Sequence, residues 1–183
     1  MLEQKLHLLD SITELLQYHT SGAVTFAATD NSLAATGIGT STFAVGDYIV
    51  VGGSSQAANN TTHKLATVSA NKITVTPDTS ITDDNAGETI TLNQEYQGEW
   101  RDVRRWSKLV GTINCSGNAY LYIDQSASPV GANTDYTTTV TVTGGTAAAF
   151  SVETVLPYAR IRVRNNGADQ TIMRAYLYGR SLT

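Results

Sequence analysis

Apolar residues near the start of the chain recur at steps of three and four. This leucine-rich stripe consists of Leu2, Leu6, Leu9, Ile12 and Leu16. Charged and amide residues fill the positions between them, which is typical of an amphipathic α-helix. We therefore expect residues 1–22 to form an N-terminal segment with a helix from Leu2 to about His19, ended by the turn residues 20–22. An isolated helix of this length is marginal in water, so the stripe should pack on a β domain or on another copy.

Short β-prone runs alternate with turn clusters through the next segment, residues 23–94. Residues 47–51 (Asp-Tyr-Ile-Val-Val) and 72–76 (Lys-Ile-Thr-Val-Thr) are two such runs, and residues 52–55 (Gly-Gly-Ser-Ser) form one of the turns. Strand-length runs with frequent turn signals predict a small antiparallel β-barrel or sandwich.

The third segment, residues 95–183, alternates apolar and polar side chains most clearly near its end. Ala159, Ile161 and Val163 alternate with the arginines at 160, 162 and 164, and residues 165–169 then form a turn. On the returning run, Ala175 and Leu177 alternate with a second polar set: Arg174, Tyr176, Tyr178 and Arg180. A period of two predicts strands with an aliphatic inner face. We expect a terminal hairpin whose arginines and tyrosines share one outer face, within an antiparallel, jelly-roll-like β-sandwich.

Composition agrees with a mostly β protein. Threonine accounts for 27 of the 183 residues, only 15% of residues are charged, and the β-branched threonine side chain favours strands over helices. The net charge of −4 argues against sequence-independent DNA binding, which depends on neutralising phosphates. Residues 1–94 carry −6 and residues 95–183 carry +2, so unlike parts of neighbouring copies can attract one another. No secretory signal and no apolar run of membrane-spanning length is visible.

Catalytic and metal-binding patterns are missing from the sequence. None of His7, His19 and His63 has a second histidine or a cysteine at ligand spacing, and no Gly-x-Ser-x-Gly motif is present. The lone Cys115 is expected to be a small buried hydrophobe. We therefore expect no catalytic, cofactor-binding or metal-binding residues, no cofactor and no enzymatic activity. The acidic residues 83–88 are interpreted as a solvated turn, with an incidental cation site as the alternative.

Two further groups are candidates for interactions. Residues 99–106 combine Trp100 and Trp106 with three arginines, which suits either stacking on single-stranded nucleic acid or, by their even spacing, one shared face in the core or at a subunit contact. The expected arginine–tyrosine face suits a protein interface, because both residue types are enriched at binding hot spots. The alternative is an ordinary solvated sheet face. The candidate interface residues are thus the leucine-rich stripe together with Arg160, Arg162, Arg164, Arg174, Tyr176, Tyr178 and Arg180.

Parts of the sequence resemble proteins of tailed bacteriophages. The first part runs Phe43-Ala44-Val45-Gly46-Asp47-Tyr48-Ile49-Val50-Val51-Gly52-Gly53, followed by Leu65-Ala66-Thr67-Val68 and Lys72-Ile73-Thr74-Val75. It resembles a β module common in virion proteins. The second runs Leu156-Pro157-Tyr158-Ala159-Arg160-Ile161-Arg162-Val163-Arg164-Asn165-Asn166-Gly167 and closes on Tyr176-Leu177-Tyr178-Gly179-Arg180. It resembles the β-sandwich of capsid decoration or tail-associated proteins.

The resemblance implies a non-enzymatic structural protein, made in the bacterial host cytoplasm and located in the virion. It favours a capsid decoration or cement protein that bridges capsomers, with the major capsid protein or another virion protein and other copies of itself as partners. Such proteins are frequently homotrimers. No membrane and no specific nucleic acid is expected as a partner. The alternatives are a tail-associated or fibre-base protein and a carbohydrate-binding β-sandwich, the latter using Tyr120, Tyr122, Tyr176 and Tyr178.

Overall fold

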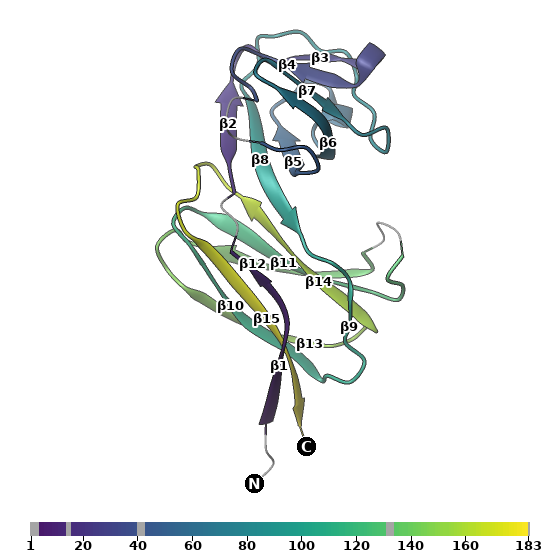
Figure 1. Cartoon of the computed structure of the whole chain (residues 1–183), viewed down its shortest axis with the longest axis vertical. Coiled ribbons are helices and arrows are strands. Elements are labelled where there is room, and N and C mark those ends of the chain that lie inside the picture. The colour runs from purple at the N-terminus through teal and green to yellow at the C-terminus, as the bar shows by residue number, and fades with distance from the viewer. Residues whose placement is uncertain (1–3, 14–15, 40–42, 131–133, 183) are drawn as a thin grey trace. The chain divides into compact units, whose positions relative to one another are not determined.

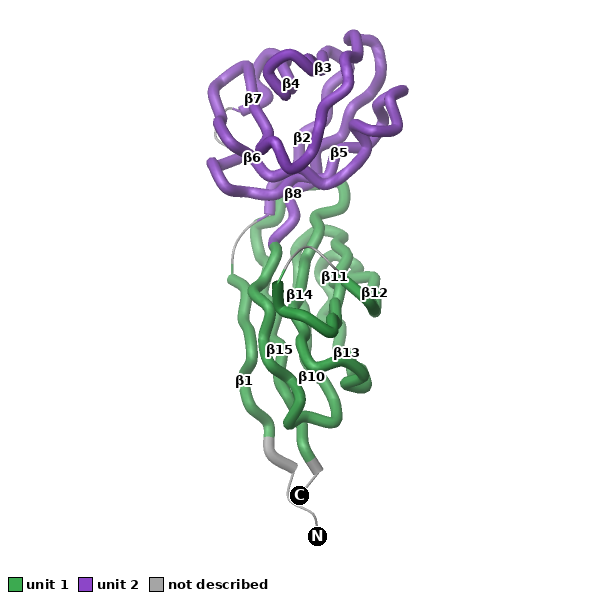
Figure 2. Tube along the Cα trace, turned by 90° about the vertical axis from the view of Figure 1, so that its right-hand side faces the viewer, with its two compact units in different colours: residues 1–15, 97–183 green, residues 16–96 purple. Residues whose placement is uncertain are grey.

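The computed structural model describes residues 4–13, 16–39, 43–130 and 134–182. Strands dominate these residues, and their only helices are two short 3-10 turns, η1 (Ala28–Asp30) and η2 (Ala57–Asn59). The described strands pair antiparallel with one another, so the expectation of a mostly β, antiparallel protein is confirmed. The chain divides into two compact units (Figure 2): unit 1 is residues 1–15 and 97–183, and unit 2 is residues 16–96.

Unit 1 is built from two sheets (Figure 1). The first sheet has the order β1 (Gln4–Ile12), β15 (Met173–Leu182), β10 (Lys108–Cys115), β13 (Ala148–Glu153). The second sheet has the order β12 (Tyr136–Val142), β11 (Ala119–Ser126), β14 (Tyr158–Asn165), and the short β9 (Arg101–Asp102) also pairs with β14. Successive strands repeatedly change sheet, as between β10 and β11 and between β14 and β15.

The core of unit 1 follows from the alternation along these strands. Leu109 and Ile113 of β10 and Leu177 of β15 are fully buried on the first sheet, and Leu121 of β11 and Ile161 of β14 are buried on the second. Because each sheet buries one aliphatic face, the unit has the character of a β-sandwich. The other face of each sheet carries the polar half of the pattern.

The predicted N-terminal helix is wrong, because residues 4–12 form the strand β1. This strand pairs antiparallel with β15 from Gln4↔Leu182 to Ile12↔Ala175, with a register shift between Leu8 and Asp10. Pairing with β15 gives the segment backbone hydrogen bonds and a core position for Ile12, which an unsupported helix lacks. Leucines two residues apart, such as Leu6 and Leu8, fit a strand as well as a helix, and the extra residue at the shift brings Ile12 to the inner face.

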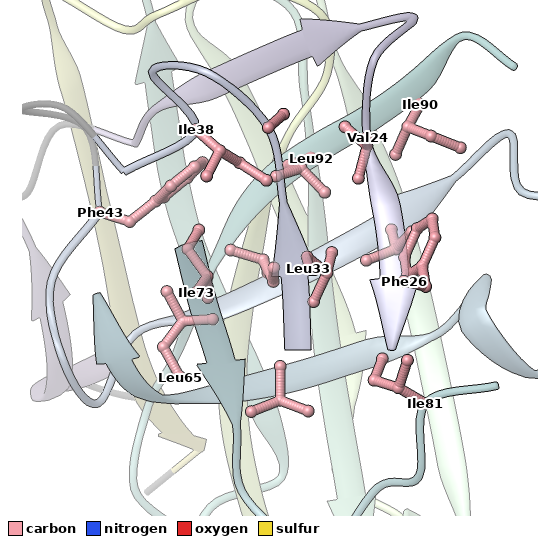
Figure 3. Close-up of a cluster of buried hydrophobic side chains, with 14 residues drawn as sticks. Val24, Phe26, Leu33, Ile38, Phe43, Leu65, Ile73, Ile81, Ile90 and Leu92 are labelled. Carbon is pink, nitrogen blue, oxygen red and sulfur yellow. The ribbon is translucent and has the colours of Figure 1, made fainter. Parts of the chain in front are cut away.

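Unit 2 contains one curved sheet that does not close into a barrel, so the barrel alternative is wrong. Its order is β2 (Tyr18–Ser21), β8 (Ile90–Gln97), β5 (Tyr48–Gly52), β6 (Thr62–Ser69), β7 (Lys72–Val75), β4 (Ser32–Ala34), β3 (Thr25–Ala27). The concave side holds a cluster of buried side chains that includes Phe26, Leu33, Ile73 and Leu92 (Figure 3). None of the helices in the described part of the chain is long and apolar enough to cross a membrane.

Candidate functional site

The outer face of the second sheet in unit 1 brings together arginines, aromatic rings and one carboxylate. The register between β11 and β14 places Tyr120 opposite Arg164, Tyr122 opposite Arg162, and Asp124 opposite Arg160. Leu121 and Ile123 alternate with these β11 residues and are buried in the core, so the paired set faces outward. We call this set, together with the neighbouring Trp100, the arginine–aromatic face; it comprises Trp100, Tyr120, Tyr122, Asp124, Arg160, Arg162 and Arg164.

Asp124 is the centre of this face, and its side chain is fully covered. Its carboxylate accepts hydrogen bonds from Arg162 Nε at 2.5 Å and Nη2 at 3.0 Å, from Arg160 Nε at 3.2 Å, and from the Thr137 hydroxyl at 2.8 Å. Burial by itself raises the pKa of Asp124. The hydrogen bonds and positive charges of Arg162, with Thr137 and Arg160, outweigh burial, so the Asp124 pKa lies below its ordinary value.

Aromatic rings stack against the same guanidinium groups. The Arg160 guanidinium carbon lies 4.6 Å from the centre of the Trp100 ring. The Tyr122 ring lies 4.7 Å from the guanidinium carbon of Arg162 and 5.2 Å from that of Arg164. These are cation–π distances. Only 14% of the Arg160 side chain and 16% of the Arg162 side chain are exposed to solvent. The face is therefore a pre-ordered surface in which two arginines bind one carboxylate and a third, Arg164, stacks on Tyr122, and its net charge is positive.

Tyr176, Tyr178, Arg174 and Arg180 lie on the other sheet, so the predicted single arginine–tyrosine face is wrong. β14 and β15 do not form a hairpin: β15 pairs with β10, with Tyr178 opposite Val110 and Tyr176 opposite Thr112. The two strands belong to different sheets because the segment that connects them, residues 166–172, is held by the buried side chains of Asn165 and Gln170. Gln170 Nε2 donates to Asn165 Oδ1 at 2.9 Å, and Gln170 Oε1 accepts from the Gly117 N–H at 2.8 Å.

The residues of the leucine-rich stripe do not share one surface. Leu6 is 60% exposed, Leu9 is half-buried, Ile12 is buried in unit 1, and Leu16 is buried in unit 2. Leu2 lies outside the described residues. The stripe therefore divides into an exposed part and two separate core positions.

The two tryptophans have different surroundings, so the expectation of one shared face is wrong. β9 is only two residues long, and the chain turns after it, with the Trp106 N–H donating to the Val103 carbonyl. Trp106 covers Gly179 of β15 and stacks on His7 at a ring-centre distance of 5.6 Å. Trp106 also lines a shallow hollow of about 240 Å³, together with Arg104 and residues 154–157.

The other candidates for chemistry have structural partners. Asp84 accepts from the Ser54 hydroxyl at 2.5 Å, Glu88 from the Ser55 N–H at 2.6 Å, and Asp83 from the Ala28 N–H at 2.7 Å. These carboxylates therefore tie loops of unit 2 together. Within the described ranges, no three His, Cys, Asp or Glu side chains are grouped so that they could hold a metal ion.

His63 is a buried residue of β6. Its Nε2 lies 3.0 Å from the Asn59 carbonyl oxygen and its Nδ1 lies 2.8 Å from the Thr79 hydroxyl. Because a carbonyl oxygen only accepts, Nε2 carries the hydrogen and Nδ1 accepts from Thr79. Burial lowers the pKa of His63, so the neutral ring is favoured.

Sequence reasoning missed Asp124 and Trp100 as members of the arginine–aromatic face, and it missed Thr137 as a hydrogen-bond partner of Asp124. Asp124 follows Tyr122 by two residues in the alternating run 119–126, so a period of two places its carboxylate on the same face of the strand as Tyr122. This is the signal in the sequence that could have identified Asp124. Its arginine partners are 36 and 38 residues further along the chain, so only the strand pairing brings them together. In comparisons with known proteins, no family and no curated sequence matches this chain.

Proposed function

We propose that this chain is a non-enzymatic structural protein of a tailed-bacteriophage virion, and that it acts as a capsid decoration or cement protein. The observation that carries the proposal is the arginine–aromatic face, which presents positive charge and aromatic rings on a rigid β-sandwich. Supporting it are the sequence resemblance and the repeated changes of sheet in unit 1, which suit a jelly-roll-like sandwich. On this proposal the partners are the major capsid protein and further copies, in a homotrimer at local three-fold positions.

The chemistry of the face suits an acidic protein surface. Arg160 and Arg162 already donate hydrogen bonds to Asp124. The groups that remain to contact a partner are therefore the edges of the tyrosine rings and the outer parts of the arginine side chains. Because these side chains are held in one arrangement before binding, less conformational entropy is lost when a partner docks. Tyrosine and arginine are also the residue types that dominate interface hot spots.

The carbohydrate-binding alternative is less well supported. Tyr120 and Tyr122 lie on the second sheet, with ring centres 6.3 Å apart, whereas Tyr176 and Tyr178 lie on the first. The four tyrosines therefore do not form a common platform for a sugar ring.

Copy number in purified virions tests the proposal. Quantitative mass spectrometry should find hundreds of copies per particle for a capsid cement protein. A dozen or fewer would favour a tail-associated or fibre-base protein, and absence from the particle would overturn the virion assignment.

A binding measurement on capsids tests the face itself. The double variant Tyr120→Ala with Arg164→Ala leaves in place the hydrogen bonds that Asp124 accepts from Arg160, Arg162 and Thr137, and it should weaken capsid binding about tenfold or more. The matched control is Arg174→Ala, an exposed arginine on the opposite sheet of the same unit. Equal binding by both variants would remove the arginine–aromatic face from the proposal.

A further inference from the structure

The shallow hollow beside Trp106 in unit 1 has largely apolar walls. Its volume is about 240 Å³, and its lining includes Trp106, Val155, Leu156 and Pro157, with Arg104 as the cationic member. Val155 is 58% exposed although it is a large apolar residue. A cavity of about 150 Å³ holds a benzene molecule, so the hollow has room for one aromatic side chain.

The two loops that form the hollow are fixed before anything binds. The N–H groups of Val155 and Leu156 donate to Gln125 Oε1 at 2.8 Å and 3.2 Å. The Val103 N–H donates to the Pro157 carbonyl at 2.9 Å, which joins one loop to the other. A partner that enters a preformed hollow loses less binding energy to ordering of the site.

Tyr136 is an aromatic side chain that the single chain leaves exposed. It is 49% exposed, and it is the only aromatic residue among the large apolar residues exposed in the described ranges. Tyr136 begins β12 and lies opposite Gln125, the residue that also holds the 154–157 loop. It does not line the hollow of its own chain. Tyr136 and the hollow are therefore two separate surfaces at the same end of the β-sandwich.

Charges of opposite sign flank these two surfaces. Arg105, next to Trp106 in the sequence, is exposed and forms no ion pair within the described residues. Asp135, next to Tyr136, is exposed as well. Among the described residues its carboxylate accepts hydrogen bonds from uncharged donors, the Ser126 hydroxyl at 3.1 Å and a backbone N–H at 2.8 Å. The surface around the tyrosine is thus complementary in charge to the rim of the hollow.

We propose that Tyr136 of one copy inserts into the hollow of the next copy, in a head-to-tail contact repeated around a three-fold axis. This deepens the proposed function by naming the contact within its homotrimer, and it rests on that function for the number of copies. A contact between two different surfaces generates a closed ring when the rotation from copy to copy closes. Surfaces that lie at one end of the molecule suit such a ring, because all three contacts then lie near the axis.

In this contact the phenol ring meets side chains that bind aromatic rings well. The Arg104 guanidinium already lies 5.9 Å from the centre of the Tyr158 ring, and Trp106 adds an aromatic wall. Tyrosine, tryptophan and arginine are the residue types enriched at interface hot spots. Asp135 then approaches Arg105 of the next copy, so each charge gains a partner. Neither surface belongs to the arginine–aromatic face, which stays available to the capsid.

Sedimentation equilibrium of the full chain tests the contact. The wild-type protein should form trimers. Tyr136→Ala removes the inserted ring and Val155→Arg places a charged side chain in the hollow, so each should weaken association about tenfold or more. The matched control is Ile172→Arg, which should associate like the wild type. Ile172 is also exposed, at 48%, but it precedes the start of β15, whereas Trp106 covers Gly179 near the other end of that strand. Circular dichroism melting checks that each variant remains folded.

A charge reversal tests the polar part of the contact. Arg105→Glu places a carboxylate against Asp135 of the neighbouring copy and should weaken association about tenfold. Arg105→Lys keeps the positive charge and should associate like the wild type.

A mixture of two variants tests the head-to-tail arrangement. Tyr136→Ala keeps an intact hollow and Val155→Arg keeps an intact tyrosine. At a concentration where each alone is monomeric, equal amounts should therefore form a dimer held by one contact, which cannot close into a ring. A wild type that does not form trimers, association unchanged in Tyr136→Ala, Val155→Arg or Arg105→Glu, or a mixture that stays monomeric would overturn the inference. None of these results changes the copy number in virions, which tests the proposed function separately.

Discussion

The Arg162 guanidinium donates two hydrogen bonds to the buried carboxylate of Asp124, with Nε at 2.5 Å and Nη2 at 3.0 Å. The two residues belong to neighbouring strands, β14 and β11, so their ion pair fastens those strands together on the outer face of the sheet. The arginine–aromatic face therefore contributes to stability as well as to the surface that unit 1 presents. A variant that removes Arg162 changes both at once, which makes it unsuitable as a pure test of binding.

Replacing Arg162 should be far more costly than replacing Arg164. Arg162→Met leaves Asp124 buried with one arginine and one hydroxyl, and breaking a buried ion pair costs about 3 kcal/mol of unfolding free energy. Arg164→Met removes a stacking contact with Tyr122 and should cost about 1 kcal/mol or less. Urea unfolding measures both values. Similar losses for the two variants would contradict a central role for the Arg162–Asp124 pair.

Because His63 is buried, the protein should become less stable as the pH falls below the ordinary pKa of histidine. Burial depresses its pKa in the folded state, so the unfolded state binds a proton first on acidification. The stabilising contribution is thus complete above about pH 6.5 and declines below it. Unfolding free energies measured between pH 5 and pH 8 should show this slope in the wild type and a smaller slope in His63→Gln. An identical slope in that variant would assign the pH dependence to other groups.

The alternation of side chains was enough to predict the β class and the inward faces of the C-terminal strands. The alternating positions Leu121, Ile161 and Leu177 are buried as a period of two requires. The N-terminal stripe was misjudged because the apolar residues at 6, 8, 9 and 12 satisfy a helical period and, with one bulge, a strand. Local sequence cannot reveal that β15 provides a pairing partner for this segment.

The candidate site was only partly predictable for the same reason. Arg160, Arg162 and Arg164 were identified from alternation along a single strand, which is a local signal. Their partner Asp124 and the separation of β14 from β15 depend on which strands become neighbours. That choice is fixed by the buried Asn165–Gln170 contact and by core packing, not by any short motif.

Cys115 should be unreactive in the folded protein. Its side chain is buried in the unit 1 core, and burial raises the pKa of its thiol to about 11, so little thiolate is present near neutral pH. A thiol reagent such as 5,5′-dithiobis(2-nitrobenzoic acid) at pH 8 should label the native protein very slowly and the urea-unfolded protein fully. Thr112→Cys is the positive control, because residue 112 is exposed on the outward face of the same strand. Rapid native labelling of Cys115 would contradict the packing of β10.

Gly179→Ala should destabilise unit 1 through a single clash with Trp106. A Cβ atom at position 179 would lie 2.5 Å from two carbons of the Trp106 ring, so the indole would have to move away from β15 and from its stacked partner His7. Overpacking of this kind typically costs about 1–3 kcal/mol. Gly22→Ala is the control, since a Cβ there meets no atom within 4 Å.

The decisive measurement is a double-mutant cycle. In a Trp106→Leu background, the unfolding free energy lost through Gly179→Ala should fall by about half or more, because the clashing ring is gone. An undiminished cost in that background would mean that the glycine is required by the backbone of β15 and not by the tryptophan above it.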